Sequence, residues 1–262
     1  MNTSADFPVL VFALSLLGLW LSAKIGGSIG DRQRNKEEEG LEDFDVIMAA
    51  ILTLLALIIG FSFSMAVNRY DQRKSYEEAE ANAIGTEYVR VDFLPSADAA
   101  KARALLKEYL DERILFYNTR VLFYSASGTR QLQQIDTTTT HLQNDLWAVM
   151  QAPAVAQPTP IVALVASGMN DVLNSQGYTQ AAWLYRIPRE AWLLMVFIAI
   201  CCNLMIGYGS RRARAKGFLF VILPLVVSIS LFLIADIDSP RSGIIRVHTV
   251  NLTSLSQSLN AH

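Results

Sequence analysis

Two acidic residues near the end of the chain are spaced as in a metal-binding loop. Asp236 and Asp238, followed by Gly243, match part of the calcium-binding loop pattern. That pattern requires further oxygen ligands and a terminal glutamate, which this stretch lacks. A turn held by an Asp–Arg pair accounts for the same residues, so we expect no metal site. This acidic turn comprises Asp236, Asp238, Pro240, Arg241 and Gly243.

Motifs for catalysis are absent from the sequence. It contains no phosphate-binding loop, zinc-protease motif, CxxC pair or nucleophile elbow. The histidines, His141, His248 and His262, lie far apart, and the only cysteines, Cys201 and Cys202, are neighbours in an apolar stretch. We therefore expect no enzyme activity, no catalytic residue and no cofactor.

A second group of residues has the spacing that helix packing or a pore requires. Ala56, Gly60 and Ser64 recur every four residues and so share one face of a helix. Small residues at this spacing let helix backbones approach closely. Phe61 and Phe63 flank the glycine, and a ring of apolar side chains can gate a pore by dewetting. This small-residue face predicts either tight packing within one subunit or contact between subunits around a pore.

A charged cluster follows the small-residue face. Asn68, Arg69, Asp71, Arg73 and Lys74 lie close together in the sequence. Such a cluster is typical of an anchor at the membrane interface. If several copies of the chain meet, the same residues would form a charged ring at a pore mouth.

Four stretches without a charged residue concentrate the apolar character of the chain, in which 52% of residues are hydrophobic. Each approaches the roughly 20 residues that a helix needs to cross a bilayer. They predict an all-α, polytopic protein with four transmembrane helices, whose partner is the lipid bilayer. The net charge of −2 provides no basic surface for nucleic acid. The four stretches are residues 7–23, 46–67, 191–208 and 217–235.

The spans divide the chain into four parts. Residues 1–67 are expected to hold the first two transmembrane helices with a short loop of basic and acidic residues between them. Residues 68–190 form a helical extramembrane insertion, large enough for a domain. Residues 191–236 hold the third and fourth transmembrane helices, and residues 237–262 form a C-terminal tail.

The insertion is predicted to begin with a helical stalk. No proline occurs between residues 46 and 93, so the second span is expected to continue beyond the membrane as one helix. Three further helices are expected after Pro95, ended by glycine or proline. They cover residues 97–127, 130–150 and 161–175, with a proline-rich extended linker over 153–160.

The orientation follows from Lys and Arg, which keep short loops in the cytoplasm. Basic residues are densest in the loops at 24–45 and 210–216, whereas the N-terminal tail has none. Both of these loops are therefore predicted in the cytoplasm. The termini and the large insertion are predicted outside it.

Three stretches together have a recognisable pattern. They are GFSFSMAVNRYDQRK at 60–74, EAEANAIGTEYVRVDFLP at 78–95 and LFLIADIDSPRSGIIRV at 231–247. In these stretches the chain resembles the bestrophin-like family of small bacterial membrane proteins, a group of largely unassigned function. The most specific part is EANAIGT, from which we define a stalk motif of Glu80, Asn82, Gly85 and Thr86.

The resemblance implies four spans with a helical insertion between the second and third. It implies a bacterial inner-membrane location and a remoter analogy to the bestrophins, pentameric anion channels whose second span lines the pore. In bestrophins the large insertion is cytoplasmic, the opposite of the side that the basic loops predict here. The bestrophin calcium clasp, with its run of acidic residues, has no clear counterpart in this chain.

Two functions from different classes fit these features. The first is a homo-oligomeric channel or pore that conducts ions, with anions suggested by the analogy and the second span lining the axis. The second is a non-conducting membrane scaffold, or an envelope interaction or stress protein, that acts through its external helical domain. The position of the second span relative to a symmetry axis separates them.

Overall fold

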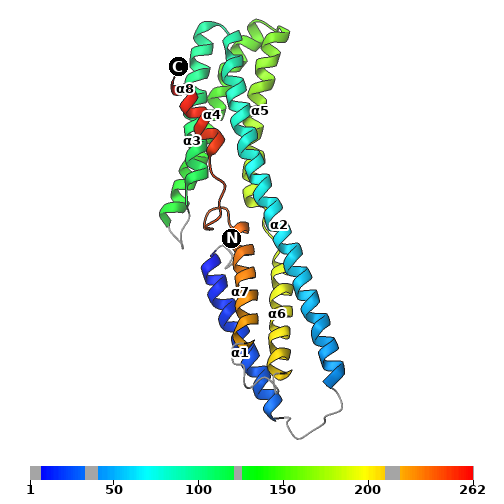
Figure 1. The fold of residues 1–262 in the computed structure, drawn as a ribbon. Helices are drawn as coiled ribbons and strands as arrows, with labels where there is room; N and C mark the ends of the chain where they lie inside the picture. Colours follow the sequence, from blue (N-terminus) through cyan, green and yellow to red (C-terminus); the bar gives the residue numbers. More distant parts are fainter. Residues whose placement is uncertain (1–6, 33–40, 121–125, 210–218, 262) are drawn as a thin grey trace. The chain divides into compact units, whose positions relative to one another are not determined.

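The computed structural model describes residues 7–32, 41–120, 126–209 and 219–261. Within these ranges the chain is helical and contains no strand. The helices follow one another as labelled in Figure 1. They are α1 (Pro8–Arg32), α2 (Leu41–Arg90), the 3₁₀ turn η2 (Val91–Phe93), α3 (Ser96–Asn118), α4 (Ala126–Ala156), α5 (Pro160–Leu184), α6 (Arg189–Gly209), α7 (Leu219–Asp238) and α8 (Val250–Asn260).

Four helical segments are long and apolar enough to cross a membrane, which confirms the all-α fold class and the four candidate spans. They are Pro8–Arg32, Phe44–Phe93, Pro160–Gly209 and Val221–Asp238. The second contains most of α2, a 50-residue helix. At 1.5 Å per residue such a helix is about 75 Å long, more than twice the thickness of the hydrocarbon core. The expectation of one unbroken helix after residue 46 is thus confirmed as far as Arg90.

The chain forms two compact units. The first unit comprises Met1–Asn68 and Arg186–Ile245, and the second comprises Arg69–Tyr185 and Arg246–His262. Helix α2 contributes residues to both. The stretch expected to be a simple C-terminal tail contains the helix α8, which belongs to the second unit.

In the first unit, α1 packs against α6 and α7. The crossing of α1 and α6 is built from glycines. A Cβ on Gly26 would overlap the carbonyl oxygen of Leu204, and a Cβ on Gly207 would overlap that of Ala23. Close backbone approach of this kind requires residues without side chains. Ser22 adds a hydrogen bond across the same contact, donated by its hydroxyl to the carbonyl of Ile200 at 2.8 Å.

In the second unit, α3 packs against α4 and α8, and α4 packs against α5. Apolar side chains from every helix of this unit meet in one core. The fully buried members include Ile84 on α2, Leu106 on α3, Leu146 on α4, Met169 on α5 and Leu252 on α8. Burial of these side chains supplies the main driving force for folding of the unit.

Two helices of the second unit, α3 and α4, end at other residues than the sequence predicts. Helix α3 ends at Asn118 rather than at residue 127, because Thr119 adopts an extended backbone and its hydroxyl donates to the Leu115 carbonyl. Helix α4 continues through Pro153, so the linker expected over 153–160 is shorter. The helix tolerates this proline because it removes only a single backbone hydrogen bond near the helix end.

Helix α5 continues through Gly177, where the last helix of the insertion was expected to end. A glycine inside a helix costs only about 1 kcal/mol. Beyond it, Thr179, Ala182 and Trp183 are buried against the core and compensate for that cost. Helix α5 begins at Pro160, one residue before the expected start, with the proline in the first turn and the Thr159 hydroxyl accepting a hydrogen bond from the Val162 amide.

Candidate functional site

The small-residue face of α2 is exposed in the single chain. Ala56, Gly60 and Ser64 all lie on the surface of the first unit. No atom of a neighbouring described segment lies within 4 Å of the position that a Cβ on Gly60 would occupy. Of the two alternatives for this face, packing within one subunit therefore has no support from the described residues.

The two phenylalanines beside Gly60 are exposed as well. Phe61 is 66% exposed and Phe63 is 41% exposed. The buried residues of this part of α2 lie at other positions of the helix, namely Leu55, Ser62 and Ala66. The spacings of seven and four residues between these three place them on one inward face of α2, and Ser62 itself is 5% exposed.

The charged cluster divides into exposed and buried members. Asn68, Asp71 and Lys74 are exposed and Arg69 is half-buried. Arg73 is only 1% exposed.

Arg73 acts at the end of α5. Its guanidinium donates hydrogen bonds to the Ala182 carbonyl at 3.2 Å and the Tyr185 carbonyl at 3.5 Å. The last carbonyls of a helix have no partner within it, and a cation there stabilises the helix end. Arg73 thus holds α5 against α2 within the second unit.

Glu80 of the stalk motif lies at the centre of a buried polar network. Its carboxylate is paired with Arg113 on α3, and neither side chain is exposed. The hydroxyls of Tyr117 and Thr179 each donate to Glu80 Oε2 at 3.1 Å. The guanidinium carbon of Arg113 lies 4.4 Å from the ring centre of Phe116. The network ties α2, α3 and α5 together.

The electrostatics of this network are those of a buried ion pair. Burial alone would lower the pKa of Arg113, but Glu80 outweighs it and holds that pKa above its usual value. Burial, with the negative charge of Glu80, raises the pKa of Tyr117. Arg113 is therefore charged and Tyr117 is a neutral hydrogen-bond donor at physiological pH.

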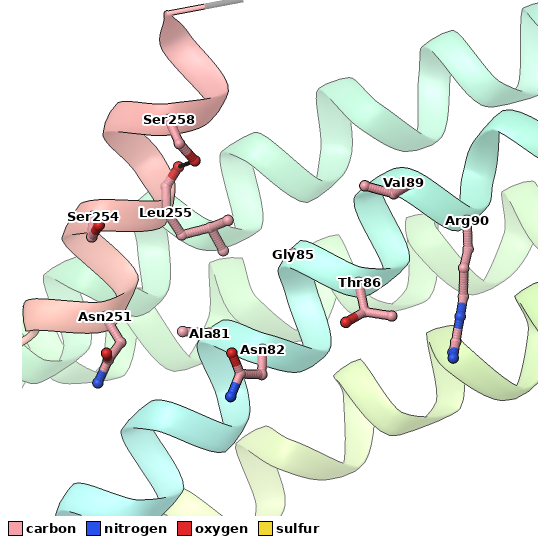
Figure 2. Close-up of a pocket in the computed structure, with 10 residues that line it drawn as sticks. All are labelled: Ala81, Asn82, Gly85, Thr86, Val89, Arg90, Asn251, Ser254, Leu255 and Ser258. Carbon is pink, nitrogen blue, oxygen red and sulfur yellow. Dashed lines mark hydrogen bonds between the residues drawn. The ribbon is translucent and has the colours of Figure 1, made fainter.

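The other stalk-motif residues line a groove between α2 and α8. Figure 2 shows Asn82 and Thr86 on α2 and Asn251 on α8 among the side chains of this groove. Its volume is about 700 Å³. A Cβ on Gly85 would lie 3.0 Å from the Leu255 side chain, so the glycine lets α8 lie close to α2.

Helix α8 is held at both ends by charged side chains. Glu77, which is buried, accepts hydrogen bonds from the main-chain amides of Asn251 and Leu252, both at 3.0 Å. Lys107 donates to the Leu259 carbonyl at 2.6 Å. An anion at the N-terminus and a cation at the C-terminus both complement the helix dipole.

The acidic turn uses its two carboxylates to bind main-chain amides. Asp236 accepts hydrogen bonds from Ile244 and Ile245 at 2.7 and 2.8 Å. Asp238 accepts from Ile187 at 3.1 Å. A Cβ on Gly243 would overlap the Asp236 carbonyl, which explains the glycine.

Arg186 binds the same turn, donating to the main-chain carbonyl of Asp238 at 3.0 Å. Pro240 is buried and Arg241 is half-buried. Across the described ranges, no three metal-ligating side chains come together. The hydrogen bonds of Asp236, Asp238 and Arg186 hold this segment as a turn after α7.

Two features of the structure were not foreseen from the sequence. One is the glycine contact of α1 with α6, for which the spacing of Gly26 and Gly30 was an available signal. The other is the set of buried carboxylates on α2, formed by Glu77, Glu80 and Glu87. Their spacings of three and seven residues place them on one helical face, which could have indicated an inward side.

Comparison with known proteins places the chain in a family. A family model described as the Bestrophin-like domain matches residues 9–252. The fold is similar to that of a bacterial bestrophin homologue from Klebsiella pneumoniae, with 14% sequence identity over 96% of this chain and 95% of that one, at a TM-score of 0.62. A single-site variant of a bacterial bestrophin homologue from Klebsiella pneumoniae is also similar, with 12% sequence identity over 97% of this chain and 96% of that one, at a TM-score of 0.65. No curated protein matches this chain.

Proposed function

Because this chain belongs to the Bestrophin-like family, we propose that it is a homo-oligomeric membrane channel whose second transmembrane helix lines the axis. The observation that carries the proposal is the exposed small-residue face of α2. No neighbouring segment comes within 4 Å of the place that a Cβ on Gly60 would take, and Ala56 and Ser64 are open on either side. A second copy of the chain would cover this face.

The narrowest point of the channel is proposed to lie at Phe61 and Phe63. Both rings are exposed in the single chain and lie on either side of the small-residue face of α2, where they would border an axis formed by several copies. A ring of apolar side chains imposes a dewetting barrier, while a hydroxyl such as that of Ser64 can replace part of an ion's hydration shell. The charge-free span around them offers no charged filter.

Selectivity for anions is proposed to arise at the charged cluster. Arg69 and Lys74 would attract anions to the pore mouth, and Asp71 partly offsets them. Arg73 is buried and donates to a carbonyl of α5, so it contributes less to the electrostatic potential at the pore mouth than Lys74 does. The resulting preference for anions over cations is modest.

The proposed setting is the bacterial inner membrane, which the chain crosses several times. The dense basic residues at 24–45 and 210–216 support a cytoplasmic position for these loops. The termini and the insertion at 68–190 then lie outside the cytoplasm. Residues 33–40 and 210–218 lie outside the described residues, so this orientation rests on their sequence.

Ion flux from reconstituted liposomes tests the channel. We expect a measurable flux from the wild-type protein and a larger flux from Phe61→Ala and Phe63→Ala, because a smaller side chain lowers the dewetting barrier. Leu55→Ala, a truncation on the buried side of α2, serves as the matched control and should leave the flux per folded protein unchanged. Background flux from all of the folded, assembled proteins would refute conduction.

A scaffold function is the second candidate, supported by the groove between α2 and α8. Amides and hydroxyls line this groove, including Asn82, Thr86 and Asn251. Apolar side chains such as Val89 and Leu255 lie among them, and a mixture of apolar and polar groups is typical of a contact between proteins. The scaffold predicts background flux from the wild type and from both alanine variants.

A further inference from the structure

Glu87 is a buried carboxyl group outside the network of Glu80, on the part of α2 that lies beyond the expected span at 46–67. Its side chain is 0% exposed. Neither carboxylate oxygen has a hydrogen-bond partner among the described residues. An ionised carboxylate in such a position is strongly unfavourable, and the group usually retains a proton instead.

The surroundings of Glu87 come from α2 and α5. Gly168 of α5 lies directly against the carboxyl group, so that a Cβ on this glycine would overlap Oε2 and would lie 2.6 Å from the Arg90 guanidinium. The charged groups that face Glu87 are Arg90 on its own helix and Asp171 on α5. Burial raises the pKa of Glu87 to about 7, Arg90 opposes the rise and Asp171 adds to it.

We propose that Glu87 is a proton-binding site that makes the packing of α5 against α2 depend on pH. The neutral carboxylic acid is tolerated in the buried contact beside Gly168. The carboxylate favours the entry of water, which requires α5 to move away from α2. This device resides in the second unit and operates whether or not the chain conducts ions.

The direction of the pH dependence follows from linkage. An ordinary unfolded-state carboxyl has a pKa near the reference value of 4.5, and the folded-state value is higher. The folded protein then binds more protons than the unfolded chain, so stability falls as the pH rises from about 4.5 to 7 and is constant above that range. The shift corresponds to a roughly 300-fold tighter hold on the proton.

Thermal unfolding of the full chain in detergent, between about pH 5 and pH 9, tests the proposal. The wild-type unfolding temperature should fall by several degrees across the range in which Glu87 ionises. Glu87→Gln, which mimics the neutral acid, should lose most of this fall. Glu78→Gln removes an exposed carboxylate from the same helix and should reproduce the wild-type profile. Parallel profiles for the wild type and Glu87→Gln would overturn the proposal.

An infrared measurement on the wild type keeps the proposal testable even where Glu87→Gln does not fold. A protonated carboxylic acid has a carbonyl stretching band that the carboxylate lacks. We expect this band at about pH 6 and its loss by about pH 8.5. The absence of the band at the lower pH would equally overturn the proposal.

Discussion

At the scale of single residues, the pair of Glu80 and Arg113 shows how a charged group can be kept inside the second unit. The carboxylate of Glu80 is fully engaged, by Nε of Arg113 and by the hydroxyls of Tyr117 and Thr179. The Nη1 and Nη2 atoms of Arg113 have no hydrogen-bond partner among the described residues, and its guanidinium lies against the Phe116 ring. Removal of one partner of a buried pair leaves an uncompensated charge, which costs far more than the pair itself contributes.

Glu80→Gln should therefore destabilise the second unit by about 3–5 kcal/mol. Glu108→Gln, an exposed change on α3, should stay within about 0.5 kcal/mol of the wild type. Chemical unfolding followed by circular dichroism measures both. Equal stability of the two variants would mean that Arg113 finds another partner or solvent.

Only part of this network could be predicted from the sequence. The EANAIGT segment identifies Glu80 as a member of the stalk motif. Its partners lie 33, 37 and 99 residues away along the chain, and no local spacing connects them. Only the packing of α3 and α5 against α2 brings Arg113, Tyr117 and Thr179 to the carboxylate.

At the scale of elements, the crossing of α1 and α6 depends on glycine. A Cβ on Gly207 would meet main-chain atoms of Ala23 and Gly27, which cannot move without separating the helices. Gly207→Ala should cost about 1–3 kcal/mol, as overpacking does in other closely packed cores. The unfolding temperature of the detergent-solubilised protein reports the loss.

Gly18→Ala is the matched control for this change, because it lies on α1 with no described neighbouring atom within 4 Å of its Cβ position. It should be neutral or slightly stabilising, since alanine favours a helix over glycine. If Gly207→Ala were as harmless as this control, the close contact of α1 with α6 would be refuted.

Element lengths were predictable where the signal was strong and local. The absence of proline after residue 46 correctly predicted the long helix α2. Gly177 and Pro153 predict helix ends that the structure does not have, because core packing of α5 and the small loss of one backbone bond in α4 outweigh a single unfavourable residue. A single glycine or proline therefore disfavours continuation of a helix, but burial of the residues beyond it can still extend the helix.

At the scale of the whole molecule, the orientation in the membrane can be measured. Single cysteines are placed at exposed Ser28 and Ser258 in a background with Cys201 and Cys202 replaced by alanine. An impermeant thiol reagent on intact cells should label the cysteine at Ser258 and not that at Ser28, since basic loops remain in the cytoplasm. Labelling at Ser28 alone would place the insertion in the cytoplasm instead.

The proposed channel requires the small-residue face of α2 to meet other copies of the chain around an axis. A cysteine at exposed Ser64 and a control cysteine at buried Ser62 test this claim at nearby positions of one helix, in the same cysteine-free background. Oxidation in the membrane should join Ser64→Cys chains into covalent dimers and leave Ser62→Cys monomeric, because only the first position is open to a neighbouring subunit. Cross-linking at neither position, or equally at both, would contradict the claim.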